Sequence, residues 1–420
     1  MKKYYERLIE AEITHNLTSM GAIVVDGPKW CGKSTTCSRF AKKIVQLQNP
    51  IVFNRYLVLA TTSMVELLEG EKPLLFDEWQ KIPDLWDFVR LSVDESQRKG
   101  QYILTGSTKP LTSTLRHTGT GRFAHIRMRT MSLWESGESN GKISLTRLFN
   151  ESNNIGGESN LTIRQLAYLI CRGGWPGALD VDEKNALNIV AKYYQGLVNA
   201  DIVDVDGIKR DPSRAKDILK AYARSISSLT NYATMISDVN KHEKILSDET
   251  FFSYLRAFEK LYVIENIQAW SPSLRSKTTI RTSDKKQFVD PSVATAALAI
   301  NPEDLMADME TMGFFFESLC ERDLRIYIES LGGTLHHYLD KNNLEIDAIV
   351  RLPNGQWGAI EIKLGGNQID DAARNLLKLK ANIDTTKMSE PAFLMVLSGY
   401  PYTMRRPDGV LVVPLGCLKN

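Results

Sequence analysis

The sequence predicts an α/β protein with a mainly helical middle part. In the first 135 residues, apolar strands alternate with helical segments, a pattern typical of a parallel sheet covered on both faces. Residues 161–260 repeat their apolar positions with helical periodicity, and an α/β pattern begins again near residue 311. The chain has 420 residues, of which 43% are hydrophobic, so it can build two to four domains with cores of their own.

Composition sets bounds on location and partners. The net charge of +2 is too small to indicate nucleic acid by itself. The five cysteines are scattered without a CxxC pair, as expected for reduced thiols in a cytoplasmic protein. No stretch approaches about 18 uninterrupted apolar residues, so we expect no membrane partner.

In the first region we expect strands at 22–27, 51–57, 73–79 and 101–107, with a helix at 34–47 after the first strand. Residues 136–160 are rich in Ser, Asn and Gly and predict a loop or a domain boundary. In the middle region, helices followed by a small hairpin predict a winged helix-turn-helix, with helices at 161–174, 184–203, 214–229 and 248–265 and strands at 263–270 and 285–290. The last region predicts helices at 314–333 and 372–383 and strands at 334–340, 344–353, 356–364 and 392–397.

A phosphate-binding motif follows the first strand. The segment GPKWCGKS, residues 27–34, fits the P-loop pattern G-x-x-x-x-G-K-[ST] between a strand and a helix, a context that argues against a chance glycine-rich turn. The glycines let backbone N–H groups turn toward phosphates, Lys33 is expected on the β- and γ-phosphates, and Ser34 on Mg²⁺. ATP and Mg²⁺ are therefore the expected cofactors. The expected nucleotide-binding residues of the loop are Gly27, Pro28, Lys29, Trp30, Cys31, Gly32, Lys33, Ser34 and Thr35.

Paired acids end the third expected strand. Asp77 is expected to hold the water shell of Mg²⁺, and Glu78 to polarise the attacking water. Two acids after a strand could also be the start of a solvated loop, but their position about 45 residues after the P-loop favours the catalytic interpretation.

Four further side chains are candidates for contacts with the γ-phosphate. Ser107 or Thr105, at the end of the fourth expected strand, could sense it by a hydrogen bond, although a polar strand cap explains them equally well. Arg116 or Arg122 could neutralise charge during phosphoryl transfer, although an arginine at such a position is more often a solvated surface residue. Action of Arg122 on a neighbour's nucleotide would require a homo-oligomer.

A second constellation lies in the last region. In an extended strand, Glu361 and Lys363 point to the same face, and Asp347 can meet them from the neighbouring strand. Glu317, on a helix, could complete a cluster that binds Mg²⁺ at Glu317, Asp347 and Glu361 and orients a water for phosphodiester cleavage. The order resembles the PD-(D/E)xK nuclease core. Three interpretations stay open: an active metal-dependent nuclease, a nuclease-like fold used for binding or regulation, and a plain exposed strand face.

The whole chain resembles the AAA-type ATPases of bacteria and archaea that carry a C-terminal domain of unknown function. The resemblance rests on GPKWCGKST, on the DE-x-Q-x-x-P run, on the succession TGS, GR and SLxE, and on GGWPGAL and KKQFVDPSVATAAL. It implies an AAA-like ATPase core at 1–135, a helical lid or linker at 136–190, a winged-helix domain at 191–300 and a restriction-endonuclease-like α/β domain at 301–420. Trp30 and Cys31 depart from the smaller or basic residues common there, but their side chains can point away from the phosphates.

The hairpin of the middle region carries a basic loop. As the wing of a winged helix it could contact DNA phosphates, or it could be a solvated hairpin tip. His336 and His337 alternate across a strand, which favours core or surface histidines over metal ligands. The five cations of the loop are Arg275, Lys277, Arg281, Lys285 and Lys286.

Three functions are consistent with these patterns. The first is a regulatory ATPase that binds ATP and ADP and acts on or near DNA through its C-terminal part. The second is a metal-dependent nuclease gated by ATP. The third is a binding protein switched by nucleotide with little hydrolysis. The first is our main hypothesis.

Overall fold

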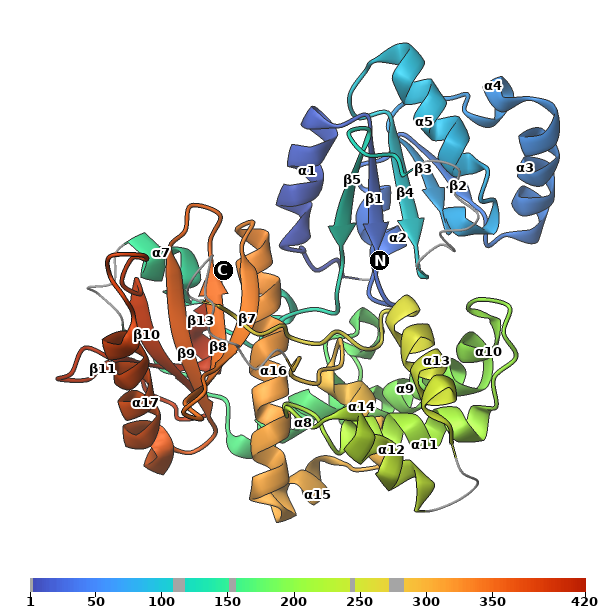
Figure 1. Cartoon of the computed structure of the whole chain (residues 1–420). Helices are drawn as coiled ribbons and strands as arrows, with labels where there is room; N and C mark the ends of the chain where they lie inside the picture. Colours follow the sequence, from blue (N-terminus) through green and yellow to red (C-terminus); the bar gives the residue numbers. More distant parts are fainter. Residues whose placement is uncertain (1–2, 109–117, 151–155, 242–245, 272–282) are drawn as a thin grey trace. The chain divides into compact units, whose positions relative to one another are not determined.

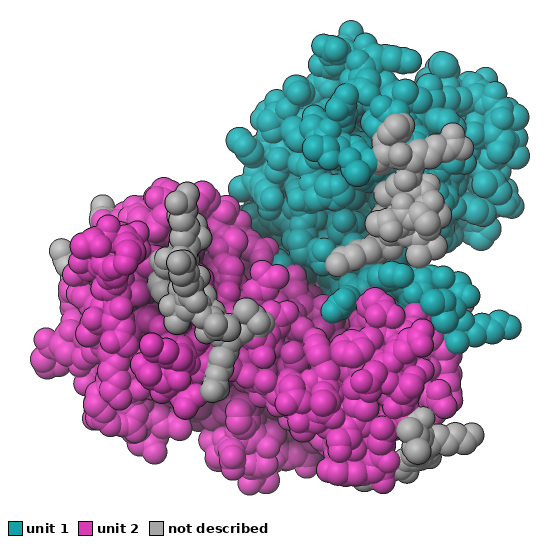
Figure 2. Space-filling model, in the orientation of Figure 1, with its two compact units in different colours: residues 1–130, 203–209, 257–262 teal, residues 131–202, 210–256, 263–420 magenta. Residues whose placement is uncertain are grey.

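The computed structural model describes residues 3–108, 118–150, 156–241, 246–271 and 283–420. By its internal contacts the chain divides into two compact units, which Figure 2 shows in different colours. Unit 1 comprises Met1–Thr130, Val203–Lys209 and Ala257–Tyr262, and unit 2 comprises Met131–Ile202, Arg210–Arg256 and Val263–Asn420. The finer division into four domains stays a prediction.

Unit 1 is built on a five-stranded sheet in the order β2-β3-β4-β1-β5, and all its pairings are parallel. Successive residues of β1 alternate between two apolar clusters, so both faces of the sheet are buried, as expected. The helix α1 (Ile9–Ser19) contacts β1 and β5, and α5 (Leu85–Ser96) contributes to the other cluster (Figure 1). The strands are β1 (Ala22–Asp26), β2 (Lys43–Gln46), β3 (Leu74–Asp77), β4 (Tyr102–Gly106) and β5 (Phe123–Arg127).

Two expectations for unit 1 were wrong. The predicted strand at 51–57 is part of helix α3 (Pro50–Thr62), because Asn49 caps the helix by accepting a hydrogen bond from the backbone N–H of Ile51, and Pro50 occupies the first turn. The second strand is β2 instead, inside the predicted helix at 34–47, which as α2 ends at Ser38. Pairing with β3 outweighs the local helix pattern there.

The remaining short helix of unit 1 is α4 (Met64–Leu67). No helix within the described ranges combines the length and apolarity needed to cross a lipid bilayer.

The middle part of unit 2 is helical, as its periodicity predicts. Its two expected strands are smaller than predicted, because only isolated antiparallel pairs join Ile264 to Phe288 and Ile267 to Lys285. The helices and turns are α8 (Ile163–Arg172), α9 (Glu183–Gly196), η4 (Leu197–Asp201), α10 (Ile202–Asp204), α11 (Pro212–Ala223), α12 (Tyr232–Asn240), α13 (Asp248–Lys260), α14 (Pro291–Leu298) and α15 (Pro302–Ala307). Part of α13 and the end of α10 fall within the segments assigned to unit 1.

The rest of unit 2 is a six-stranded mixed sheet in the order β11-β12-β10-β9-β8-β7. Helix α16 (Met309–Ser330) contacts β7, β8 and β9, and α17 (Ile369–Asn382) packs against β8, β9 and β10 (Figure 1). The strands are β7 (Thr334–Leu339), β8 (Glu345–Arg351), β9 (Trp357–Lys363), β10 (Phe393–Ser398), β11 (Met404–Arg405) and β12 (Leu411–Pro414).

The chain around residues 131–150 also belongs to unit 2. It contains α6 (Leu133–Ser136), β6 (Ile143–Ser144) and α7 (Leu145–Asn150) where the sequence predicted a loop or a boundary. Strand β13 (Leu418–Lys419) pairs in parallel with β6, and the Ser139 hydroxyl donates to the Leu418 carbonyl at 2.6 Å. The end of the chain is therefore fixed to the segment that begins the unit.

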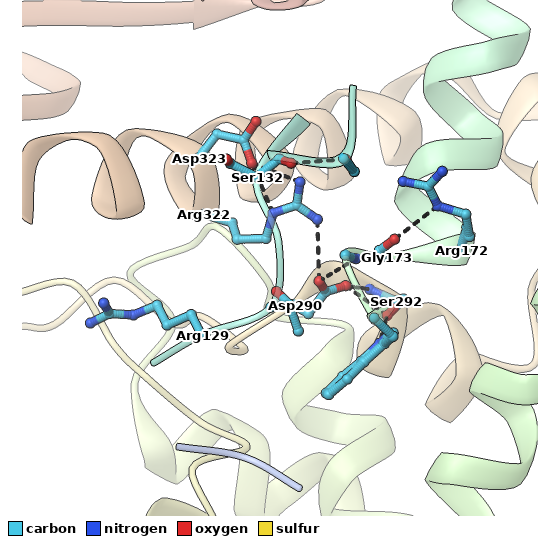
Figure 3. A network of polar contacts seen from close by, with 12 residues as sticks. Arg129, Ser132, Arg172, Gly173, Asp290, Ser292, Arg322 and Asp323 are labelled. Carbon is cyan, nitrogen blue, oxygen red and sulfur yellow. Dashed lines mark hydrogen bonds and ion pairs between the residues drawn. The ribbon is translucent and has the colours of Figure 1, made fainter. Parts of the chain in front are cut away.

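A buried polar network joins four separate segments of unit 2 (Figure 3). Arg322 of α16 pairs with Asp323 at 2.7 Å and with Asp290 at 3.2 Å. Asp290 also accepts from the backbone N–H of Gly174, and Asp323 from that of Leu133, each at 2.9 Å. The GGW, DPS and SLxE motifs thus meet in one network with α16.

Candidate ATPase site and acidic cluster

The P-loop lies where the sequence predicts it, between β1 and α2 in unit 1. Gly32 has a φ of 104°, a left-handed conformation that glycine adopts without steric cost. Gly27 packs so closely that a Cβ there would lie 2.0 Å from the Met128 carbonyl oxygen. Both glycines are therefore required by the shape of the loop.

Lys33 points into this loop. Its side chain is buried, and its Nζ donates to the carbonyl oxygens of Gly27 at 2.9 Å and Pro28 at 2.8 Å. Trp30 is 59% exposed, whereas Cys31 is buried beneath the loop. An ammonium group held by loop carbonyls can move to phosphate oxygens if an anion enters.

Asp77 connects three strand ends at the carboxyl edge of the sheet. Its Oδ1 accepts from the hydroxyls of Ser34 at 2.7 Å and Thr105 at 2.6 Å, and its Oδ2 accepts from Gln48 at 2.8 Å. Gln48 was not foreseen, because it follows β2, the strand that the sequence pattern concealed. The arrangement places a hydroxyl and a buried carboxylate directly beside the P-loop.

Glu78 lies next to Asp77 but has a separate partner. Its Oε2 accepts from the Ser107 hydroxyl at 2.7 Å and from the Gln80 amide. Thr105 and Ser107, two alternatives in the sequence, therefore contact different acids: Thr105 bonds Asp77, and Ser107 bonds Glu78.

Arg122 lies at the opposite edge of the sheet. Its carbonyl accepts from the N–H of Ala22 at the amino end of β1, whereas the P-loop follows the carboxyl end. Its guanidinium pairs with Asp94 at 2.7 Å. A strand of this length separates the two edges by roughly 15 Å, so Arg122 is not beside the P-loop of its own chain. A role at a neighbour's nucleotide stays a prediction, and Arg116 lies outside the described residues.

The structure brings together the acidic cluster predicted in unit 2. Lys363 Nζ lies 3.0 Å from Asp347 Oδ2 and 2.8 Å from Glu361 Oε2, on adjacent strands β8 and β9. The backbone N–H of Ile362 donates to the same Asp347 oxygen at 2.7 Å, and the Asn375 amide donates to Glu361 at 3.3 Å. The pattern of alternate strand residues could predict the first three residues, but not Asn375, which comes from α17.

Lys285 corrects the expectation of an exposed basic wing. It is fully buried, and its Nζ contacts Glu317 at 2.6 Å, Glu321 at 3.0 Å and the Asp347 carbonyl at 3.0 Å. Lys286 is also buried, with its Nζ 4.1 Å from the centroid of the Tyr232 ring. The other three cations of the predicted loop lie outside the described residues.

The electrostatics of the cluster separate its acids. Burial, reinforced by the neighbouring Asp347, raises the pKa of Glu361 to about 8. Burial opposes ionisation of Asp347 too, but the ammonium groups of Lys363 and Lys285 lower its pKa. Burial raises the pKa of Glu317 well above its usual range although Lys285 pairs with it. One acid of the strand pair thus favours the protonated form and the other the ionised form, which is a property of acid–base pairs.

The two sites offer different groups to a metal ion. In the part of the chain that the structure describes, no group of three or more His, Cys, Asp and Glu side chains could hold a metal ion. Lys363 bridges the two strand acids of the cluster directly. A nucleotide-bound Mg²⁺, in contrast, takes one or two protein oxygens besides phosphates and waters. The Ser34 hydroxyl and the Asp77 carboxylate, 2.7 Å apart, are oxygens of that kind.

Neither histidine of β7 joins this cluster as a ligand in the described structure. His337 is buried with its Nε2 3.0 Å from the Ser283 carbonyl oxygen, and burial lowers its pKa to about 4. His336 lies near the Thr334 hydroxyl, at 3.0 Å.

Three family models match consecutive parts of the chain. Residues 19–136 match the AAA domain. Residues 163–304 match a domain of unknown function (DUF8612), and residues 312–418 match another (DUF4143). Comparison with curated protein sequences finds no match.

Solved structures similar to the chain include a Walker-type ATPase of Pyrococcus abyssi, at 15% identity and a TM-score of 0.44, with 70% of this chain and 96% of that chain covered. A RuvB variant of Thermotoga maritima matches at 12% identity and a TM-score of 0.27, covering 61% of this chain and 88% of that one. A chain of Drosophila ORC bound to DNA matches at 12% identity and a TM-score of 0.18, covering 70% and 85%.

The parallel sheet, the P-loop and the matched domain together define the class of the first part of the chain. Residues 19–136 form a P-loop ATPase domain of the AAA type, a class of nucleotide-binding proteins. The particular feature of this chain is that the AAA-type domain precedes two domains of unknown function. The winged-helix and nuclease-like assignments of those parts stay predictions.

Proposed function

We propose that this chain binds ATP with Mg²⁺ at the P-loop of unit 1, hydrolyses it, and uses the cycle to regulate an action of its C-terminal part on DNA. The observation that carries the ATPase proposal is the bond of 2.7 Å between the Ser34 hydroxyl and Asp77, beside Lys33 and next to Glu78. A hydroxyl, a carboxylate, an ammonium group and a second carboxylate are the protein groups that phosphoryl transfer to water requires.

Each residue has a distinct task in this proposal. The loop N–H groups and Lys33 bind the phosphates, and Lys33 exchanges the two loop carbonyls for phosphate oxygens. Ser34 and Asp77 would hold Mg²⁺, which supplies positive charge to the phosphate oxygens when it is bound. Glu78 orients and polarises the water that attacks the γ-phosphorus.

Paired variants test the ATPase proposal. Lys33→Ala is expected to abolish binding of ATP, because the ammonium contact with the phosphates is lost, whereas Glu78→Gln is expected to bind ATP and to hydrolyse it about 10²–10⁴-fold more slowly. Lys42→Ala, a change of an exposed lysine in the same unit, is the control. Binding is measured by calorimetry and turnover by phosphate release. Normal turnover by Glu78→Gln would remove that residue from the mechanism.

The regulatory part of the proposal predicts coupling to DNA. If the C-terminal part acts on DNA, duplex DNA should change the rate of ATP hydrolysis. ATP should also change the affinity for DNA, and DNA should change the affinity for ATP by the same factor. Identical hydrolysis rates and DNA affinities in all nucleotide states would leave the ATPase proposal intact but would contradict the action on DNA.

A second candidate function rests on the cluster in unit 2. Asp347, Glu361 and Lys363 lie together, and the pKa values of the two acids are shifted in opposite directions, as in sites that transfer protons. We propose nuclease activity as the alternative, in which Lys363 leaves one carboxylate when a divalent cation enters. Because Lys363 is a quarter exposed, it can move without opening the core.

Cleavage assays decide this alternative. Mg²⁺- or Mn²⁺-dependent cutting of DNA or RNA should disappear in Asp347→Ala and Lys363→Ala and persist in Asp371→Ala, a change of an exposed acid on α17. Absence of cleavage by the wild type across duplex and single-stranded substrates, both metals and all nucleotide states would exclude it.

A further inference from the structure

Glu78 is held in an unusual backbone conformation. Its φ of 59° and ψ of 50° are left-handed, a region that residues other than glycine and asparagine seldom adopt. It directly precedes the short helix η1 (Trp79–Lys81) at the end of β3. Such a conformation persists only where the surroundings determine it, and it is common at functional sites.

Two donors reach the same carboxylate oxygen of Glu78. Ser107 donates its hydroxyl to Oε2 at 2.7 Å, and Gln80 donates its Nε2 to that same atom. Oε1 takes part in neither bond. The Glu78 carboxylate is therefore held by these two donors through a single oxygen.

The oxygen of the Gln80 amide lies close to Gly106. A Cβ built on Gly106 would lie 3.3 Å from Gln80 Oε1, 3.3 Å from Trp79 Nε1 and 3.2 Å from Asp26 Oδ1. These three atoms are buried polar atoms for which the described structure shows no hydrogen-bond partner. Polar groups from the ends of β1 and β3 therefore converge at Gly106, the last residue of β4, where a Cβ would make tight contacts with them.

We infer that Gln80 is a positioning residue for ATP hydrolysis, which keeps Glu78 oriented when Ser107 turns to the γ-phosphate. A serine hydroxyl has a single proton, so Ser107 cannot donate to Glu78 and to a phosphate oxygen at once. When the γ-phosphate accepts the hydrogen bond from Ser107, the Gln80 amide still donates to Glu78 Oε2 and holds it. The inference rests on the proposed ATPase function, and it gives the glutamine of the DE-x-Q motif a task of its own.

Substitutions of equal size separate this role from simple packing. Gln80→Met keeps the volume and removes the donor, whereas Gln80→Glu keeps the shape and places a second carboxylate against Glu78. We expect kcat to fall on the order of 10- to 100-fold in both, with the larger loss in Gln80→Glu, because misplacement of a catalytic group by about 1 Å has effects of this size. KM and the affinities for ATP and ADP should stay within about twofold of the wild type, because in this proposal Gln80 acts through Glu78 and not on the nucleotide.

Two further variants complete the set. Gly106→Ala should lower kcat less than Gln80→Met does, because a methyl group 3.3 Å from Gln80 Oε1 crowds the amide but removes no donor. Lys81→Ala, a change of the exposed neighbour on η1, should match the wild type. Wild-type kcat in Gln80→Met, or a loss in Gln80→Glu no larger than that in Gln80→Met, would overturn the inference.

The outcome is distinguishable from failure of the ATPase proposal. If the wild type hydrolyses ATP and Glu78→Gln does not, a normal Gln80→Met enzyme rejects the positioning role alone. If the wild type does not hydrolyse ATP, the ATPase proposal fails, and nucleotide-bound crystal structures decide the geometry. The Glu78 carboxylate should keep its place in the wild type and lose it in Gln80→Met, and an unchanged carboxylate in the variant would reject the inference.

Discussion

At the scale of single residues, the two candidate sites hold their carboxylates in different ways. Asp77 accepts from two neutral hydroxyls and an amide, whereas Asp347 and Glu361 share the ammonium group of Lys363. A carboxylate held by neutral donors can exchange a hydroxyl for a metal ion at little electrostatic cost. A carboxylate already paired with an ammonium group must lose an ion pair first, so metal binding should be weaker in unit 2.

The acid with the raised pKa makes the stability of unit 2 depend on pH. The pKa of Glu361 rises from 4.5 to about 8 in the folded chain, so the folded state binds this proton more tightly than the unfolded state. The free energy of unfolding should therefore fall as pH rises from about 4.5 to 8, by a few kcal/mol, and stay low above that range. Glu361→Gln does not ionise and avoids this loss.

Thermal melts in EDTA at several pH values check this prediction. The Tm of Glu361→Gln minus that of the wild type should increase with pH through that window. Glu390→Gln, a change of an exposed glutamate in the same unit, should show no such trend. A Tm difference between Glu361→Gln and the wild type that is independent of pH would contradict the raised pKa of Glu361.

At the scale of elements, the buried network around Arg322 explains why helices α8, α14 and α16 stay together. Asp290 caps α14 through the N–H of Ser292, binds the backbone at Gly174 and pairs with Arg322. Neither Asp290 nor Asp323 is exposed to solvent. Removal of the guanidinium would leave both charges buried without a cation, which is far more costly than loss of a surface ion pair.

Arg322→Met is therefore expected to destabilise unit 2 by about 3–5 kcal/mol. Arg374→Met is the matched control, since Arg374 pairs with Asp371 on the surface of α17 and its loss should cost about 0–1 kcal/mol. Urea unfolding followed by tryptophan fluorescence measures both. Equal effects of the two substitutions would show that the buried network does not stabilise the unit.

At the scale of the whole molecule, the chain forms two compact units with different stabilising factors. Nucleotide binds at the P-loop of unit 1 in our proposal, and by mass action it should raise the unfolding temperature of that unit alone. Leu418 is fully buried on β13, whose pairing with β6 belongs to unit 2. Its truncation leaves a cavity in unit 2 and should cost about 2–5 kcal/mol there.

Scanning calorimetry with and without ADP and Mg²⁺ tests this separation. We expect two unfolding transitions. ADP should raise the transition temperature of unit 1, and this increase should be absent in Lys33→Ala. Leu418→Ala should lower the transition temperature of unit 2. A single transition that responds to both changes would mean that the units unfold as one.

Much of this structure could be read from local patterns. The P-loop, the acids after β3 and the ExK strand lie on short segments whose spacing directly predicts which residues share an edge or a face. Helix α3 could not be predicted from its apolar run alone, because the signal was the Asn49–Pro50 start rather than the apolar residues. Lys285 looked like an exposed wing residue, because nothing near it in the sequence indicates the acids of α16 that it contacts.

The sequence by itself determined the phosphate-binding loop and the acidic strand ends, since these depend on neighbours a few residues apart. Only the tertiary structure decided the order of the strands, the burial of Lys285 among the acids of α16, and the bonding of Ser107 and Gln80 to one oxygen of Glu78. These features depend on contacts between distant segments, and such contacts form only when the cores that bring the segments together are built.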